Sequence, residues 1–149
     1  MSRREIREQI FKVLFRAEFY TREELEEQLE LSVEEIQAPE EDIDYISRKT
    51  RDISLHLIEI DELINARARK WKTSRMAKAE LAIIRLAVYE MNYEEDIPVS
   101  VAINEAVELA KRYGDDRGPG FVNGILAQLV PETSEDADDD ALRNSAAES

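Results

Sequence analysis

The sequence predicts an all-helical protein, and three observations support this fold class. Hydrophobic residues recur at intervals of three and four along most of the chain, which is the period of a helix face. Residues that begin or end helices flank these stretches, and no stretch shows the alternation of a half-buried strand. The chain has 149 residues, of which 43% are hydrophobic, and no cysteine. It is therefore long enough to fold around a core without disulfide bonds.

The first predicted helix follows Ser2, which forms a capping box with Glu5. Its inner face carries a helical stripe of Ile6, Ile10, Val13, Leu14 and Ala17. Thr21 and Glu24 open a second, short and acidic helix, which we expect to be peripheral. Ser32 with Glu35 can open a further turn.

After Pro39 the hydrophobic residues follow a heptad pattern with one polar member, which predicts a helix of about 25 to 30 residues. The pattern consists of Ile43, Ile46, Thr50, Ile53, Leu57, Ile60 and Ile64. Such a stripe can be part of the core or the seam of a dimer. The oligomeric state stays open on this basis, and a homodimer is possible.

Three further helices are expected in the second half of the chain. Thr73 and Ser74 are expected to cap a helix whose segment 81–91 is apolar on nearly every side and so buried. A second runs from Pro98 to Gly114, with proline first and glycine last. After a glycine-rich loop over 115–120, the last helix starts near Pro119 and stops before Pro131.

The formal net charge of −14 is unevenly distributed. Residues 1–22 have six basic and three acidic groups, whereas 23–47 have eleven acidic and no basic groups. The segment 48–130 is neutral, and 131–149 has seven acidic groups and one basic. We expect a helical domain over 1–131 and, because 132–149 has few apolar residues, a disordered acidic tail. The net charge excludes broad, nonspecific coating of nucleic acid.

Catalytic motifs are absent from the sequence. With His56 as the one histidine, neither a helical di-iron site nor a zinc hydrolase motif can be assembled. His56 itself is expected to be a solvated or half-buried helix residue. No glycine-rich nucleotide-binding motif and no membrane-length apolar run occurs. We therefore expect a cytoplasmic protein that is not an enzyme and has no metal or cofactor.

Two basic clusters contrast with this acidic chain. Arg3, Arg4 and Arg7 fall within two turns of the first helix, where they can bind phosphates, although a solvated helix end is the alternative. Trp71 lies among basic residues and could be a stacking platform, but its place at a helix junction favours a buried anchor. Phe121 could be a core residue or a base-stacking ring. Glu105 and Glu108 favour an ordinary helix face, with Glu108 paired to Arg112.

Several motifs, in this order and spacing, resemble the NusB family of bacterial transcription antitermination factors. They are Arg4-x-x-Arg7, Trp71-x-x-x-Arg75, Ile84 to Glu90 (IRLAVYE), Ile97-Pro98, Val101 to Lys111 (VAINEAVELAK) and Phe121 to Gly124 (FVNG). The resemblance implies an all-helical fold of two small packed bundles. It also implies binding of the single-stranded boxA element of nascent ribosomal RNA, together with the small-subunit ribosomal protein NusE. The wider partner is the antitermination complex of RNA polymerase with other Nus factors.

The resemblance also implies site residues. RNA contacts fall on the N-terminal arginines and on the start of the last helix, and a first-helix aromatic faces the ribosomal protein. The RNA-binding residues are then Arg3, Arg4, Arg7, Lys78, Glu80, Lys111 and Phe121, and the protein-binding residue is Phe15.

The sequence departs from the family at two places. Ile6 and Ile10 stand where small residues are common, and Gly120 stands where a basic residue is usual. The second change weakens the grip of this loop on phosphate. Two alternatives remain: a helical adaptor that binds only proteins, and a fragment of an rRNA methyltransferase, whose helical module is similar. The absence of a cofactor motif disfavours the second.

Overall fold

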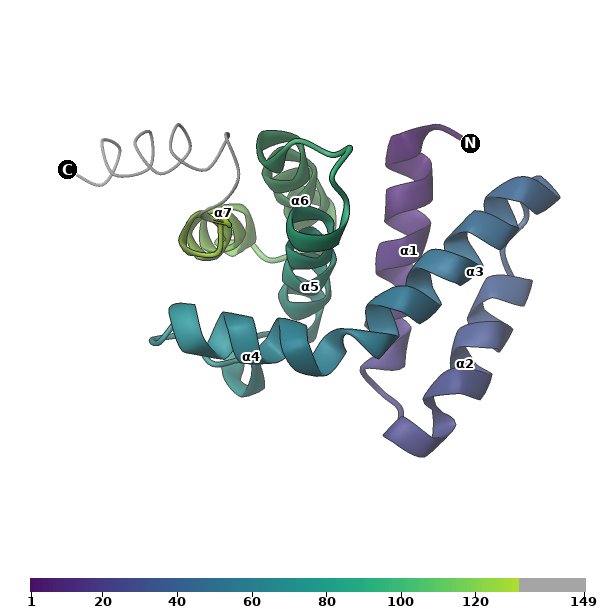
Figure 1. The fold of residues 1–149 in the computed structure, drawn as a ribbon, viewed down its shortest axis with the longest axis horizontal. Coiled ribbons are helices and arrows are strands. Elements are labelled where there is room, and N and C mark those ends of the chain that lie inside the picture. The colour runs from purple at the N-terminus through teal and green to yellow at the C-terminus, as the bar shows by residue number, and fades with distance from the viewer. Residues whose placement is uncertain (132–149) are drawn as a thin grey trace. The chain divides into compact units, whose positions relative to one another are not determined.

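Helices form all the regular structure of residues 1–131, the part of the chain described by the computed structural model (Figure 1). In order they are α1 (Arg3–Ala17), α2 (Arg22–Glu34), α3 (Glu40–Leu55), α4 (Leu57–Arg67), the short 3₁₀ helix η1 (Thr73–Arg75), α5 (Lys78–Tyr93), α6 (Val99–Tyr113) and α7 (Gly118–Gln128). The all-helical class is confirmed. The chain divides into two compact units, and the boundary lies between Leu57 and Ile58.

In the first unit, α1 packs against α2 and α3. Its start follows the predicted capping box: the Ser2 hydroxyl accepts from the Glu5 backbone N–H at 3.1 Å and donates to the Glu5 carboxylate at 3.1 Å. The helical stripe buries its middle, namely Ile10, Val13 and Leu14 together with Phe11. Local capping and one apolar face therefore account for this helix.

The acidic helix α2 differs from its prediction in two ways. No new turn opens at Ser32, because α2 continues through it and buries it beside Leu29 and Val33. The helix is also not peripheral, since it packs against both α1 and α3. Thr21 precedes α2 as predicted, but its side chain makes no capping hydrogen bond.

The long helix predicted after Pro39 is interrupted at His56. The Nδ1 of its half-buried imidazole donates to the Asp52 carbonyl at 2.8 Å, the acceptor that the backbone N–H of His56 would use in a continuous helix. That N–H bonds to the Ile53 carbonyl at 3.0 Å, so α3 ends and α4 begins on either side of His56. The prediction of one helix is wrong because a side chain competes with the backbone here.

The heptad stripe is nevertheless buried on both sides of this interruption. Ile46, Ile53, Ile60 and Ile64 are at most 1% exposed. Its polar member, Thr50, is also buried, and its hydroxyl donates to the Ile46 carbonyl at 2.9 Å. These five side chains therefore belong to the core and are not available as a dimer seam, whereas Ile43 and Leu57 are half-buried.

In the second unit, α5 is the central helix, and α6 and α7 pack against it and against each other. Every residue from Leu81 to Met91 except Arg85 is buried, as the apolar pattern of this segment predicts, and Glu80 just before it is buried as well. Helix α5 is capped by Ala77, because Thr73 and Ser74 form η1 instead. Helix α6 lies between Pro98 and Gly114 as predicted, and α7 has Pro119 in its first turn.

None of the helices in residues 1–131 combines the length and the apolar character that crossing a bilayer requires. The tail predicted over 132–149 lies outside the described residues.

Candidate nucleic-acid and protein interfaces

The predicted arginines lie on the first two turns of α1. Arg3 and Arg4 are exposed and Arg7 is half-buried. Arg3 and Arg7 are separated by one helical turn and so lie on one face, with Arg4 beside them. We call these three residues the arginine row. Guanidinium groups spaced in this way can bind successive phosphates, and the positive end of the helix dipole adds to their field.

The loop before α7 packs on a buried carboxylate. Glu80 is only 6% exposed. Its Oε1 lies 3.4 Å from the position that a Cβ on Gly114 would occupy, and 3.3 Å from that on Gly118. A Cβ at Gly114 would also lie 2.8 Å from the Ala110 carbonyl oxygen. Gly114 therefore requires glycine. The Glu80 carboxylate packs against both glycines of this loop.

Phe121 lies in the first turns of α7 and is half-buried. Its ring meets the indole of Trp71 edge to face, with 5.3 Å between centroids and an interplanar angle of 85°. The prediction that Trp71 is a buried anchor is wrong, since it is 48% exposed. Its exposure depends on how the connection between α4 and α5 folds, and no local pattern reports this.

Lys78 and Lys111 are both exposed, at the start of α5 and in the last turn of α6. The ammonium of Lys111 pairs with the Glu108 carboxylate at 3.0 Å. The partner of Glu108 is thus Lys111, and not the predicted Arg112. A cation already paired on the surface contributes less to an anion than an unpaired one, because the ligand must displace its partner.

Phe15 belongs to an aromatic row along α1. Its half-buried ring stacks on buried Phe11 at 6.0 Å and meets the ring of Phe19 edge to face at 5.4 Å. Phe19 is 60% exposed, and Tyr20 beside it is also exposed. The row therefore leads from the core to an apolar surface, which is typical of a protein contact. The sequence pattern alone did not identify Phe19 as a site residue. The signal that indicates it is the spacing of four residues between Phe11, Phe15 and Phe19, which places the three rings on one helix face.

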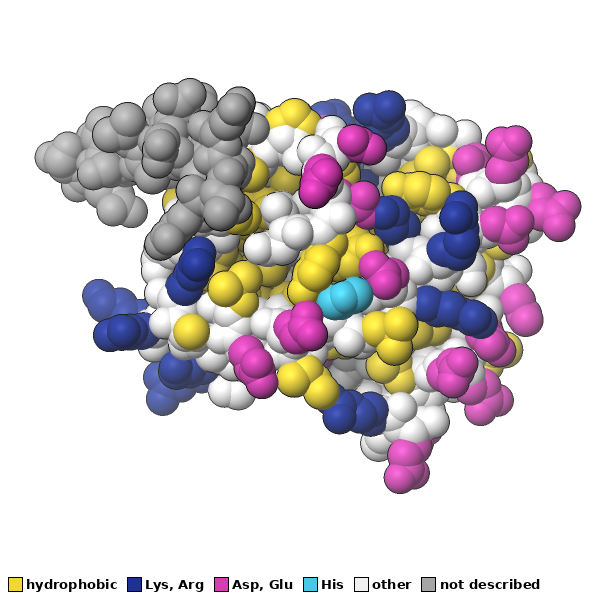
Figure 2. Space-filling view, viewed as in Figure 1, with side chains coloured by type: hydrophobic (Ala, Val, Ile, Leu, Met, Phe, Trp, Pro, Cys, Tyr) yellow, Lys and Arg dark blue, Asp and Glu magenta, His cyan; other side chains and the backbone are white. Residues whose placement is uncertain are grey.

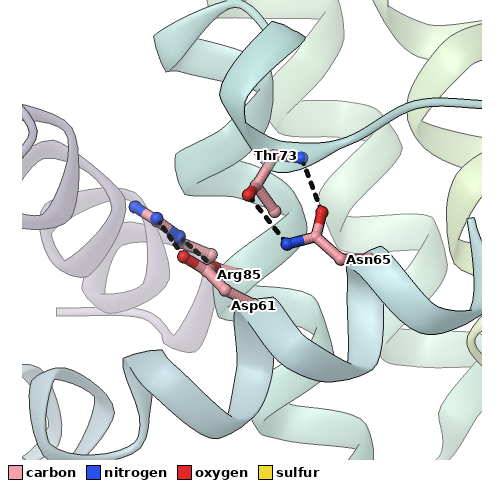
Figure 3. A network of polar contacts seen from close by, with 4 residues as sticks. All are labelled: Asp61, Asn65, Thr73 and Arg85. Atoms are coloured by element: carbon pink, nitrogen blue, oxygen red, sulfur yellow. Dashed lines mark hydrogen bonds and ion pairs between the residues drawn. The ribbon is translucent and has the colours of Figure 1, made fainter.

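A polar network joins α4 to the elements that follow it (Figure 3). The Asp61 carboxylate accepts two hydrogen bonds from the Arg85 guanidinium, at 2.8 and 2.6 Å. Burial raises the pKa of Asp61 to about 6 and lowers the pKa of Arg85 to about 10. Both groups therefore stay charged at neutral pH, and the pair fixes α4 on α5.

The same network holds the start of η1. The Asn65 side chain accepts from the Thr73 backbone N–H at 2.9 Å and donates to the Thr73 hydroxyl at 3.2 Å. Its backbone carbonyl accepts from the Lys72 ammonium at 2.9 Å. The connection before η1 is thus anchored to the last turns of α4.

The described residues include no group of three or more His, Asp or Glu side chains that could hold a metal ion. What they offer are cations, exposed aromatic rings and an apolar row, which suit binding rather than catalysis.

Comparisons with known proteins identify relatives of the whole described part. The model of the NusB family matches residues 4–131. The transcription antitermination protein NusB of Agathobacter rectalis is 54% identical over 131 residues, which cover 87% of this chain and 100% of that protein.

Solved structures agree with this similarity. T. maritima NusB is 37% identical and has a TM-score of 0.80, covering 91% of this chain and 95% of that one. A chain in a crystal structure of antitermination factors NusB and NusE in complex with double-stranded RNA is 27% identical, with a TM-score of 0.72. That match covers 85% of this chain and 94% of the other.

Proposed function

Because this chain belongs to the NusB family, which comprises transcription antitermination factors and not enzymes, we propose that it binds the boxA element of nascent RNA together with the ribosomal protein NusE. The similarity to a chain from a complex of NusB, NusE and RNA supports both partners. On this proposal the protein works on transcripts in the cytoplasm, in the antitermination complex of RNA polymerase and other Nus factors.

The observation that carries the RNA proposal is the arginine row, Arg3, Arg4 and Arg7, at the start of α1. A few guanidinium groups on a chain of net charge −14 bind phosphates locally and give modest, salt-sensitive affinity. Phe121 supplies a ring for an unstacked base, as single-stranded RNA recognition commonly uses. In the second unit, Lys78 and Lys111 are further cations that RNA can contact, and Glu80 acts by holding the loop before α7.

The observation that supports NusE binding is the aromatic row of Phe15 and Phe19, which ends beside Tyr20. An exposed phenylalanine costs free energy in water, which docking of an apolar partner surface recovers. A partner that also contacts RNA would add to the contacts made by this chain, so we expect RNA to bind more tightly to the pair.

RNA binding is tested by titrating boxA RNA into the protein at several salt concentrations, with and without NusE. We expect Arg3→Ala plus Arg7→Ala to weaken binding by at least tenfold. The slope of log affinity against log salt should fall by about 1.4, or 0.7 for each phosphate contact on a single strand.

Arg22→Ala plus Arg48→Ala is the matched control, because it removes the same charge from exposed positions on α2 and α3. The control should change affinity less than twofold. Equal losses in the two double variants would indicate a general charge effect, and binding of NusE without any binding of RNA would favour a helical adaptor instead.

Sedimentation across protein concentrations tests whether a homodimer forms.

A further inference from the structure

We propose that Trp71 and Phe121, with the cations of the adjoining loop, form a second RNA contact that stacks unpaired bases without reading their identity. This inference rests on the proposed RNA-binding function, which already includes Phe121, and adds Trp71 and the cations beside it. We call residues 68–72 the tryptophan loop, and the Trp71 and Phe121 rings the aromatic corner.

The geometry of the aromatic corner suits a base. The two ring planes are nearly perpendicular, at 85°, and their centroids are 5.3 Å apart. A base that stacks parallel to one ring is therefore nearly perpendicular to the other ring. Nearly half of the Trp71 surface is open to solvent. Base–aromatic stacking tolerates any sequence, because every base has a π face.

Positively charged residues flank Trp71 in the sequence. Arg69, Lys70 and Lys72 in the tryptophan loop are exposed, as is Arg75 in η1, and the segment 67–78 contains no acidic residue. Within residues 1–131, the side chains of Arg69, Lys70 and Arg75 have neither an ion pair nor a hydrogen bond. Figure 2 shows Lys and Arg side chains gathered around the end of α4. Unpaired cations beside an aromatic ring favour a polyanion that also carries flat rings, which is single-stranded nucleic acid.

The tryptophan loop is held in place before any ligand arrives. The Trp71 backbone N–H donates to the Ala68 carbonyl at 2.9 Å, and the Ala68 backbone N–H donates to the Ile64 carbonyl at 2.8 Å. On the other side of the loop, Asn65 binds both the backbone and the hydroxyl of Thr73 (Figure 3). A preorganised ring loses little conformational entropy when a base stacks on it, so more of the stacking free energy appears as affinity.

Trp71 is the one tryptophan of the chain, so its intrinsic fluorescence reports on this site directly. The full-length protein, with NusE, is titrated with boxA RNA extended by unpaired uridines and with a scrambled RNA of equal length. We expect both RNAs to quench the fluorescence, with midpoints that match binding measured by anisotropy. Trp71→Ala should weaken binding of both RNAs by the same factor, on the order of tenfold. Trp71→Phe, which keeps a stacking ring, should retain most of the affinity.

Two further variants separate charge from stacking. Arg69→Ala plus Lys70→Ala should lower the salt slope by about 1.4 and leave the quenching at saturation unchanged. Tyr45→Ala removes an aromatic side chain of similar exposure from α3 and should have no effect on either readout. Thermal melts of each variant establish that it is folded.

The outcomes distinguish this inference from the proposed function. RNA binding that depends on the arginine row but leaves Trp71 fluorescence and Trp71→Ala affinity unchanged would overturn the aromatic corner alone. Quenching with loss of affinity in Trp71→Ala, together with a normal Arg3→Ala plus Arg7→Ala variant, would support the corner and reject the arginine row. Weaker NusE binding in Trp71→Ala, with RNA affinity intact, would instead make the corner a protein contact.

Discussion

The arginine row and the tryptophan loop both carry positive charge, but they are supported in different ways. The arginine row lies on α1, where Ser2 caps the helix and residues within a few turns form its apolar stripe. The tryptophan loop is irregular backbone, held by Asn65 and by a ring contact with Phe121, which is far away in the sequence. The first surface follows from local structure, whereas the second exists only when the second unit is folded. Changes to tertiary contacts should therefore affect the two surfaces unequally.

The largest effect is expected from breaking the ion pair that fixes α4, which carries the tryptophan loop. Asp61→Ala removes the carboxylate that accepts two hydrogen bonds from the largely buried Arg85 guanidinium, and we expect a loss of about 3 kcal/mol in the free energy of unfolding. Urea denaturation measures this loss. The double variant Asp61→Leu plus Arg85→Leu removes both charges and should recover at least half of it. A double variant as unstable as the single one would contradict the view that the loss comes from a buried charge deprived of the Asp61 carboxylate.

Asn65→Ala should separate the two surfaces more specifically. It removes the acceptor of the Thr73 N–H, which we expect to cost about 1 to 2 kcal/mol in the free energy of unfolding. RNA affinity should fall severalfold and Trp71 quenching should weaken, while the contribution of the arginine row to the salt slope persists. Asn65→Asp keeps the acceptor and is the control. Unchanged quenching in Asn65→Ala would mean that the loop does not need this anchor.

The corresponding change at the arginine row is Ser2→Ala, which removes the N-cap of α1. We expect a loss of about 1 kcal/mol in stability, from one lost capping bond. RNA affinity should change less than twofold, because the rest of α1 keeps the arginines on one face. Ser2→Gly should cost only a few tenths of a kcal/mol. A large loss of RNA affinity in Ser2→Ala would show that the arginines need the capped first turn to hold them in place.

The smallest effect is expected at Gly120, where the resemblance to the family leads us to expect a basic residue. A Cβ at this position meets nothing within 4 Å, so a longer side chain fits without a clash. Gly120→Lys should raise RNA affinity about threefold and increase the salt slope by about 0.7, one added phosphate contact. The same RNA titration measures both values. Gly120→Gln tests whether the gain comes from charge, and an equal gain in both variants would contradict this.

Local chemistry made several elements predictable. The capping box at Ser2, the proline and glycine that flank α6, and the apolar segment of α5 each act over a few residues, so their outcome can be worked out from neighbouring residues. The interruption at His56 could not be predicted in this way. No glycine or proline marks it, and it arises from one imidazole that takes a backbone acceptor from its own helix.

The candidate sites show the same division. The arginine row could be identified from sequence because a helix sets the relative positions of residues four apart. The burial of Glu80 and the contact between Trp71 and Phe121 could not, because each depends on a segment distant in sequence: the Gly114–Gly118 loop for Glu80 and the start of α7 for Trp71.

The sequence by itself determined that the chain is helical, that positive charge gathers at the start of α1 and after α4, and which residues share the apolar face of a helix. These properties depend on periodicity and on charges a few residues apart. Only the tertiary structure decided that the acidic α2 is part of a packed unit, that the heptad stripe is core, and that an aromatic corner faces solvent. Those outcomes depend on contacts between distant segments, whose free energies no local pattern contains.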